Sequence, residues 1–324
     1  MAYRPPYELT LAALKSHGEI MQLVGRYEGA YGAVPPPMLV RKNRIRTIAG
    51  TLAIEGNPLD EEQITAILDE KRVMGSKRDV LEVKNAIAVY ADAASFDPGR
   101  EPDLLRAHGA LVRGLARDAG RFRSGAVGVM RGARVAHVAP PPREVPRLVR
   151  RLLEYVRCAD ADALVTSAVV HYELEFIHPF SDGNGRIGRF WQHLVLCRFH
   201  PIFSAIPVES VVSARRRDYY RVLGECDRAG SSTAFVEHSL AVIRDALASL
   251  LAEAVSHRPT GVARLDLARA TLGTRVFSRK DWRALFPMIS TATASRDLRE
   301  GVDQGVLVRR GTKALAEYRY RRSR

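Results

Sequence analysis

The sequence predicts a mainly α-helical protein with a small C-terminal domain that also contains strands. Three observations support this fold class. Apolar residues make up 46% of the 324 residues, which is enough to fill a core. Helical patterns, interrupted by proline and glycine breaks, run through most of residues 1–255. Patterns typical of strands are limited to one hairpin near residues 123–138 and to the end of the chain, and the length predicts about two domains or three small ones.

The N-terminal region is expected to be helical, with breaks at Pro35–Pro37 and at Gly56–Pro58. Asp60 is expected to cap the helix that follows the second break, because its carboxylate can accept a hydrogen bond from an unpaired N–H of the first turn. The predicted helical segments are pieces within 1–34, then 39–54, 60–71 and 77–94.

The central region is expected to hold one hairpin among helices. Val127, Val129 and Val135 flank Arg131-Gly132-Ala133, which favours a turn between two short strands. A proline run ends the hairpin. Helices are predicted over 103–118, 143–158, 162–177, 186–199, 215–227 and 233–254.

The C-terminal part begins with a composition break at 256–261, interpreted as a linker. Two short strands are predicted around Arg310-Gly311. Three helices precede them, over 262–271, 278–285 and 290–304. Three helices followed by a hairpin are the outline of a winged helix-turn-helix domain. The predicted domains are therefore an N-terminal helical region over 1–100, a core over 101–255 and a winged helix over 256–324.

Most of the net charge of +14 lies in this last domain. Residues 258–324 contain 16 Lys or Arg and 6 Asp or Glu. Two interpretations stay open for this excess. It is either an ordinary solvated basic surface or an electrostatic footprint for DNA. Docking of a target or partner protein is the alternative role for a winged helix.

Several classes of protein are excluded by simple counts. No apolar run is long enough to span a membrane, and the N-terminus has no pattern of a secretory signal. Cys158, Cys197 and Cys226 are odd in number and widely spaced, which argues against a disulfide framework or a zinc cluster. We therefore expect a cytoplasmic protein with no membrane partner.

The stretch HPFSDGNGRIGRF at 178–190 combines residue types that suit phosphate chemistry. Pro179 disfavours a helical conformation at His178, so one helix should end there and SDGNG should form a loop that opens the next helix. A helix start exposes unpaired N–H groups, and Gly183 and Gly185 let a phosphate approach them closely.

The charged residues of the stretch add to this chemistry. Arg186 and Arg189 are three residues apart and can point toward one anion. Asp182 offers the hard oxygen that Mg²⁺ prefers. His178 can take a proton from a hydroxyl group. Together they suggest attack by a hydroxyl group on a nucleotide phosphate.

This stretch resembles the signature of Fic-domain proteins, H-x-F-x-[D/E]-G-N-G-R-x-x-R. The resemblance extends over roughly residues 40–250. Every fixed position of the signature is matched, by His178, Phe180, Asp182, Gly183, Asn184, Gly185, Arg186 and Arg189. It implies a helical Fic core and, because the signature is intact, a protein adenylyltransferase that moves AMP from ATP to a Ser, Thr or Tyr hydroxyl and releases pyrophosphate.

The resemblance also implies roles for the matched residues. His178 would be the general base, Phe180 would anchor the loop, and Asp182 would hold Mg²⁺ against the α- and β-phosphates. The three residues after Asp182 would form an anion hole, and the two arginines would hold the β- and γ-phosphates. The hairpin over 123–138 would be the flap that binds the target by strand addition. Tyr219 or Tyr220 is a candidate neighbour of adenine, although tyrosines at helical spacing usually pack in the core.

A second stretch, TLAIEGN at 51–57, resembles the inhibitory signature [S/T]-x-x-x-E-[G/N] of many Fic proteins. Thr51, Glu55 and Gly56 match it, which places an inhibitory helix in the N-terminal region. If Glu55 pairs with Arg189, that arginine cannot hold the γ-phosphate, and ATP binds unproductively. Without the resemblance, Glu55 would be interpreted as a surface acid near a helix end.

The resulting hypothesis is an autoinhibited protein adenylyltransferase that uses ATP and Mg²⁺. We expect a target protein, self-modification and a homodimer. One alternative is a nucleic-acid-binding regulator whose Fic core senses nucleotide. Another is a Fic enzyme that removes AMP, with Glu55 positioning water, or that transfers another phosphate-linked group. His171 and Glu175 are interpreted as a surface or supporting pair, and His193 as a packed histidine.

Overall fold

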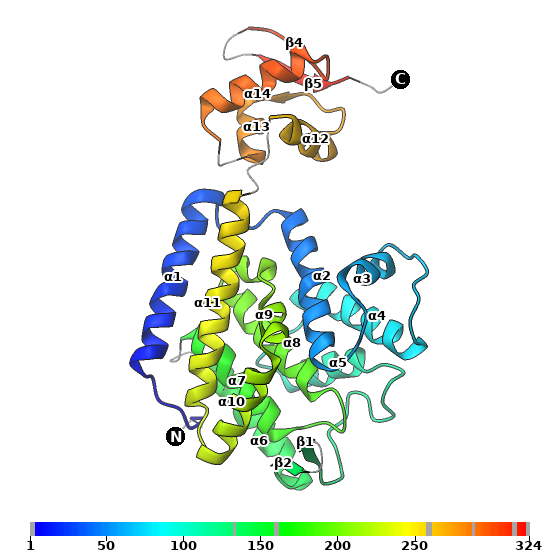
Figure 1. Cartoon of the computed structure of the whole chain (residues 1–324), viewed down its shortest axis with the longest axis vertical. Helices are drawn as coiled ribbons and strands as arrows, with labels where there is room; N and C mark the ends of the chain where they lie inside the picture. Colours follow the sequence, from blue (N-terminus) through cyan, green and yellow to red (C-terminus); the bar gives the residue numbers. More distant parts are fainter. Residues whose placement is uncertain are drawn as a thin grey trace. The chain divides into compact units, whose positions relative to one another are not determined.

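The computed structural model describes residues 4–131, 134–158, 162–256, 261–286, 289–312 and 316–321 (Figure 1). The chain forms two compact units. The first comprises residues 1–24 and 33–249, and the second comprises residues 25–32 and 250–324. The fold is mainly α-helical, as the sequence predicts. None of the helices within these described ranges has the length and apolar content needed to cross a lipid bilayer.

The N-terminal segment forms a single long helix where the sequence suggested pieces. This helix, α1, runs over Leu11–Tyr31 and lies beside α11, Thr233–Ser256 (Figure 1). Thr10 hydrogen-bonds Glu237 at 2.5 Å, and Arg244 contacts Glu19 at 3.1 Å. These contacts fix the two helices side by side within the first unit.

The helices after the first proline break match the prediction closely. Asp60 caps α3, and its side chain and that of Gln63 form a capping box. Gly56 has φ of +93°, a backbone conformation that glycine adopts easily and that turns the chain after α2. The elements are α2 (Pro37–Ile54), α3 (Glu61–Leu68), α4 (Lys77–Ala91) and the 3₁₀ turn η1 (Ala93–Ser95).

The helix predicted over 103–118 is shorter than expected. It is α5, Glu101–Leu111, and the chain after it forms turns. Gly114 and Gly120 have φ of +72° and +76°, which a right-handed helix does not permit. The predicted extension to residue 118 is therefore wrong.

The hairpin is present, and its two strands are antiparallel. They are β1, Gly128–Arg131, and β2, Arg134–Val138, and the register shifts between Val129 and Met130. Gly132 and Ala133 of the predicted turn lie outside the described residues.

The centre of the first unit is α7, which is buried along nearly its whole length. Apolar residues lie around its circumference, together with the buried polar residues Thr166, Ser167, His171 and Glu173, as a helix surrounded by others allows. The 3₁₀ turns are η2 (Pro142–Glu144) and η3 (Pro201–Ala205), and the α-helices are α6 (Val145–Arg157), α7 (Ala163–Ile177), α8 (Asn184–Phe199), α9 (Val208–Ala214) and α10 (Arg216–Ala229). Helix α9 was not predicted.

The second unit contains helices and a three-stranded antiparallel sheet in the order β3-β5-β4. Its elements are α12 (Gly261–Leu272), β3 (Phe277–Ser278), α13 (Arg279–Leu285), α14 (Thr291–Asp303), β4 (Leu307–Arg310) and β5 (Glu317–Tyr320). Three helices and a terminal hairpin follow the predicted order, and the two-residue β3 is an addition. Phe277, Trp282 and Leu298 pack in its core. The sequence pattern also predicts that Arg309, Arg310 and Lys313 lie at the tip of the wing, and of these Lys313 lies outside the described residues.

Candidate active site

The central loop begins where α7 ends, at His178. His178 has φ of 50° and ψ of 59°, a left-handed conformation, and its N–H donates to the carbonyl of Leu174 at 3.0 Å. This conformation is uncommon for a residue other than glycine. The following proline disfavours the right-handed helical region and so explains why the helix stops here.

Hydrogen bonds from Asn184 hold the loop. The N–H of Phe180 donates to Asn184 Oδ1 at 2.9 Å, and Asn184 Nδ2 donates to the carbonyl of Phe180 at 2.8 Å. Phe180 is fully buried. It therefore anchors the loop in the core. The Asn184 side chain is occupied by the loop, so only its backbone N–H is available to an anion.

Two further residues, which the sequence analysis missed, support this loop. His108 stacks on Phe180 with ring centroids 3.6 Å apart, and its Nε2 lies 2.9 Å from the carbonyl of Asp182. Its Nδ1 accepts from Gly120 N–H, so Nε2 carries the proton and donates. Burial lowers the pKa of His108, which keeps the ring neutral. The side chain of Arg123 donates to the carbonyl of His178 at 2.6 Å.

Glycine is required at position 183, where the loop becomes α8. Gly183 has φ of 85°, and a Cβ there would lie 2.7 Å from a methyl group of Val112. A Cβ on Gly185 would overlap Glu55 Oε1. The first N–H groups of α8 have no acceptor within the helix, and backbone at this point can approach an anion closely. This geometry fits the predicted phosphate nest.

Arg189 is held by the segment that resembles an inhibitory signature. Its Nη2 donates to Glu55 Oε1 at 2.5 Å, and its Nε donates to Thr51 Oγ1 at 2.8 Å. Arg189 is buried, whereas the Glu55 side chain is 34% exposed. Burial acts to lower the pKa of Arg189, but the Glu55 carboxylate outweighs it, so the pKa is raised above its usual value. Arg189 is therefore charged and paired.

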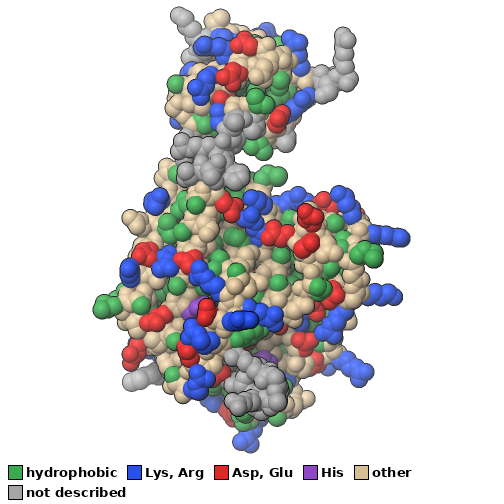
Figure 2. All heavy atoms as spheres, in the orientation of Figure 1, with side chains coloured by type: hydrophobic (Ala, Val, Ile, Leu, Met, Phe, Trp, Pro, Cys, Tyr) green, Lys and Arg blue, Asp and Glu red, His purple; other side chains and the backbone are tan. Residues whose placement is uncertain are grey.

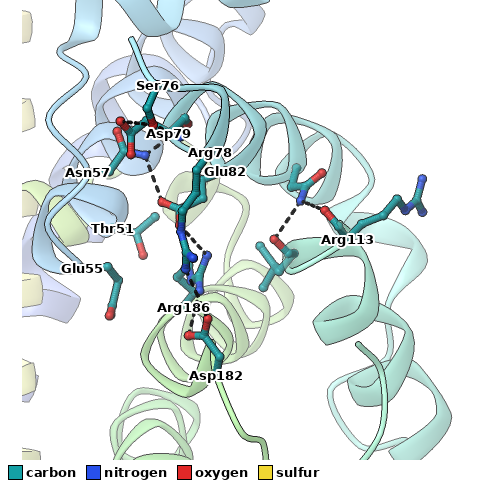
Figure 3. A network of polar contacts seen from close by, with 12 residues as sticks. Thr51, Glu55, Asn57, Ser76, Arg78, Asp79, Glu82, Arg113, Asp182 and Arg186 are labelled. Atoms are coloured by element: carbon teal, nitrogen blue, oxygen red, sulfur yellow. Dashed lines mark hydrogen bonds and ion pairs between the residues drawn. The ribbon is translucent and has the colours of Figure 1, made fainter. Parts of the chain in front are cut away.

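Arg186 does not point toward the same place as Arg189. Its Nη2 donates to Asp182 Oδ1 at 3.2 Å, and its Nη1 lies 3.7 Å from Glu82 Oε1 on α4 (Figure 3). The expectation that both arginines face one anion is therefore not met in this state. The reason is that carboxylates on different elements pair with the two guanidinium groups: Glu82 of α4 lies near Arg186, and Glu55 at the end of α2 pairs with Arg189.

A cavity of about 220 Å³ lies at the junction of the loop, α8 and α10. Most of the predicted site residues line it, and Arg186 does not. The lining residues are Glu55, Glu175, His178, Ser181, Asp182, Gly183, Asn184, Gly185, Arg189, Tyr219, Tyr220, Leu223, Gly224 and Asp227. The structure thus brings the loop, the Glu55 segment and α10 to one hollow.

The two tyrosines differ in their surroundings. Tyr219 is buried, and its hydroxyl lies 3.0 Å from His171 Nε2 and 3.2 Å from Glu175 Oε1. Tyr220 is half-buried, and its hydroxyl donates to the carbonyl of Ile54 at the end of α2, at 3.4 Å. Tyr220 therefore offers more of its ring to the cavity.

The histidines of the flanking helices are packed. His171 is 1% exposed, so it is not a surface residue, and burial lowers its pKa to about 3. Burial also lowers the pKa of His193 to about 4. Both rings are neutral at ordinary pH.

The catalytic candidate His178 is half-buried at the cavity. Its Nδ1 lies 3.3 Å from the carbonyl oxygen of Glu175. A carbonyl can only accept, so Nδ1 carries the proton in this contact and Nε2 carries the lone pair. That tautomer suits a general base.

The described side chains could bind a divalent cation only if a nucleotide supplied further oxygen ligands. Among the described residues, no group of three or more His, Cys, Asp or Glu could hold a metal ion. Asp182 lines the cavity with a side chain that is 45% exposed. A single carboxylate is sufficient for Mg²⁺ when nucleotide phosphates and water supply the other oxygens.

Comparison with known proteins points to one family. A model of the Fic/DOC family matches residues 98–196. A curated protein adenylyltransferase Fic from Nematostella vectensis is 27% identical over 209 residues, which is 60% of this chain and 46% of that protein. Fic-1 from C. elegans, a solved structure, is 20% identical with a TM-score of 0.58 and covers 75% of each chain, which supports the fold alone.

The chain spans less than half of the length of the curated adenylyltransferases that it matches in Nematostella vectensis and Caenorhabditis elegans. A solved Fic family protein from Desulfovibrio desulfuricans G20, however, is matched over 98% of both chains, with 40% identity and a TM-score of 0.75. A match of that identity over nearly the whole length, together with the family model over the central loop, shows that this chain belongs to the Fic family.

Proposed function

We propose that this protein transfers AMP from ATP to a Ser, Thr or Tyr hydroxyl of a target protein, and that Glu55 keeps it inactive. One observation carries the proposal. A single cavity joins a histidine base, a carboxylate and a helix N-terminus, and its buried arginine is already paired with Glu55. The name of the Nematostella vectensis relative supports AMP as the transferred group.

The phosphates of ATP would bind at the start of α8. The N–H groups of Gly183, Asn184 and Gly185 would receive phosphate oxygens, as at other helix N-termini. Arg186 and Arg189 would hold the β- and γ-phosphates once they leave their present carboxylate partners. Asp182 would hold Mg²⁺, which when bound neutralises charge on the phosphates. The half-buried Tyr220, more than the buried Tyr219, would contact adenine.

The chemical step needs one base and one leaving group. His178 Nε2 would take the proton of the target hydroxyl, whose oxygen attacks the α-phosphorus. The bond between that phosphorus and the bridging oxygen to the β-phosphate breaks, and pyrophosphate leaves with the electron pair. Catalysis would come mostly from positioning and charge neutralisation. The hairpin β1–β2 would hold the target backbone by adding it as a strand.

Glu55 would inhibit by competing with the γ-phosphate for Arg189. The ion pair with Glu55 at 2.5 Å and two hydrogen bonds to Thr51 engage Nε and Nη2 of Arg189, so the γ-phosphate would have to compete with Glu55 for this side chain. ATP would then bind with its α-phosphate out of line for attack. In this proposal residues 1–100 carry the inhibitory helix, residues 101–255 carry the catalytic residues, and residues 256–324 form the winged helix.

Intact mass spectrometry after incubation with Mg²⁺ and ATP tests the transfer. The Glu55→Gly protein should gain the mass of AMP residues on itself, and the wild-type protein much less. Parallel incubations with GTP, UTP and CDP-choline test the alternative that another phosphate-linked group is transferred. Loss of AMP from a premodified sample would support the AMP-removal alternative. No mass change of the Glu55→Gly protein with any donor would refute self-modification.

The second unit supports a second candidate function, DNA binding. Arg296 and Arg299 are exposed on α14, on the side opposite the buried Ala294 and Leu298. Basic side chains at these positions can contact phosphates or base edges. Acidic side chains are interspersed on the face shown in Figure 2, which leaves protein docking as the alternative.

A titration of the full chain with duplex DNA at two salt concentrations tests DNA binding. Affinity should fall steeply with salt, with a slope of about −0.9 per phosphate contact. The Arg296→Ala and Arg299→Ala changes should each reduce that slope by about one contact. Absence of binding at low salt would leave docking as the role of this unit.

A homodimer and a cytoplasmic location stay predictions. Light scattering of the purified chain tests the first, and fractionation of the source cells tests the second.

A further inference from the structure

A polar network joins the inhibitory segment to the first signature arginine by a route that does not include Glu55. Asn57 lies two residues after Glu55 and is 7% exposed. Its Nδ2 donates to Glu82 Oε2 at 3.0 Å and lies 3.2 Å from the carbonyl of Asp79 (Figure 3). Its Oδ1 accepts from the N–H of Leu59. The amide nitrogen of Asn57 therefore connects the segment after α2 to α4, and its amide oxygen stabilises the turn in which Asn57 lies.

Glu82 continues the network to the nucleotide site. Its other oxygen, Oε1, lies 3.7 Å from Arg186 Nη1 and 3.4 Å from Arg78 Nε. Arg186 reaches Asp182 in turn at 3.2 Å, and Arg78 Nη2 lies 3.7 Å from Asp182 Oδ2. Figure 3 shows Glu82 between Asn57 and Arg186, with Asp182 beyond. One carboxylate on α4 thus faces both the inhibitory segment and a predicted phosphate ligand.

Arg186, the buried arginine of this network, has N–H groups that are not hydrogen-bonded to any of the described residues. Arg186 is 5% exposed, and among the described residues its Nε and Nη1 have no hydrogen-bond partner. Its contact with Glu82 is an ion pair without a hydrogen bond. Unsatisfied buried donors are costly, so an incoming phosphate oxygen would be favoured at this position. A phosphate that draws Arg186 away would remove a positive charge from beside Glu82 Oε1. The change would reach Asn57 through its hydrogen bond to Glu82 Oε2.

We propose that Asn57 is a positioning residue for inhibition: through Glu82 it fixes the far end of the Glu55 segment and couples that segment to the state of Arg186. This inference rests on the proposed function of the site. Glu55 has Thr51 one turn before it on α2 and Asn57 just after the turn at Gly56. With both sides fixed, Glu55 meets Arg189 at little entropic cost. Without the Asn57 contacts, forming the ion pair between Glu55 and Arg189 must also order a loose turn. The γ-phosphate would then compete more effectively for Arg189.

The test measures AMP transfer by the full-length Asn57→Ala protein with Glu55 intact. The rate should rise on the order of tenfold, the lower end of the effect expected from one hydrogen bond to a charged group. Asn57→Asp, which is nearly the same size but sets a carboxylate against Glu82, should raise the rate at least as much. It keeps the proposal testable if the alanine variant does not fold.

Asn85 provides a matched control on the same helix as Glu82. It is also a buried asparagine, and its Nδ2 donates to the carbonyls of Leu111 and Arg113, away from Arg186. Asn85→Ala should lose comparable contacts and leave transfer at the wild-type rate. An equal rise in Asn85→Ala would mean general loosening of α4 and would overturn the inference.

The double variant Glu55→Gly with Asn57→Ala separates a positioning role from an independent one. If Asn57 acts only by placing Glu55, the double variant should transfer AMP no faster than Glu55→Gly. A further tenfold gain would overturn the inference. The inference about Asn57 would also be overturned if the Glu55→Gly protein is active while the single variants Asn57→Ala and Asn57→Asp both transfer AMP at the wild-type rate. That outcome would leave the proposed function intact. Complete inactivity of Glu55→Gly would instead count against the proposed function itself.

Discussion

Replacing Glu55 by glycine is the most direct test of inhibition. Arg189 is 2% exposed and keeps its charge, so without Glu55 it is a buried cation that keeps its hydrogen bonds to Thr51 but has lost the carboxylate that pairs with it. A γ-phosphate is then the strongest anion that can reach it. A hydrogen bond to a charged group contributes about 1.5–3 kcal/mol, so removing the competing carboxylate should raise transfer roughly 10- to 100-fold.

The assay is the initial rate of incorporation of labelled AMP over a range of ATP concentrations. Glu55→Gln should give an intermediate rate, because the amide can still accept a hydrogen bond but carries no charge. Glu70→Gly is a matched control, since Glu70 is an exposed glutamate with φ of 59° that glycine can replace without strain. It should transfer at the wild-type rate.

A second substitution shows whether the gain depends on Arg189. Glu55→Gly with Arg189→Ala should lose most of the gain, because both changes act on one phosphate contact. An unchanged rate in Glu55→Gly, or a gain that survives Arg189→Ala, would refute the competition between Glu55 and the γ-phosphate.

Three further predictions concern single side chains. His178→Ala should lower transfer by about 10²- to 10⁴-fold while a fluorescent ATP analogue still binds, and near wild-type transfer would exclude His178 as the base. Phe180→Ala should lower the free energy of unfolding by about 3–5 kcal/mol in a urea titration, because Phe180 is fully buried against His108; a loss under 1 kcal/mol would show that the loop is not anchored there. Burial raises the pKa of Glu209 from 4.5 to about 7, so the folded protein keeps this proton over a range where the unfolded chain has lost it. Stability should therefore fall by about 3 kcal/mol as pH rises from 4.5 to 7, and Glu209→Gln should remove that decline in unfolding titrations at pH 5 and pH 8; equal pH dependence in both proteins would contradict the assignment.

Much of the fold was predictable because its signals are local. Asp60 as a cap, Gly56 as a turn residue and Pro179 as the end of a helix each act within a few residues of their position. The prediction that the helix beginning near residue 103 extends to residue 118 was wrong because its end is not set by a local signal. Gly114 and Gly120 carry a positive φ that depends on where the following chain must go, and periodicity does not report it.

The candidate site was only partly predictable. The signature loop is contiguous, so its glycines and His178 could be identified together. His108 gave no signal, because a histidine in an amphipathic helix 74 residues before Asp182 is unremarkable until the two meet. The pairing of Glu55 with Arg189 followed from the resemblance to a family and not from any local pattern, since 134 residues separate them.

Neighbours along the chain decide the loop that opens α8, most of the helices around it and the chemistry that the side chains of the loop can perform, so these features could be predicted before the fold was known. Which carboxylate faces which arginine depends instead on how helices distant in the sequence pack against one another. Arg186 and Arg189 lie three residues apart, yet α4 supplies Glu82 to one and the end of α2 supplies Glu55 to the other. The physical reason is that ion pairs depend on separations of a few ångströms between elements, and those separations are set by the packing of whole helices.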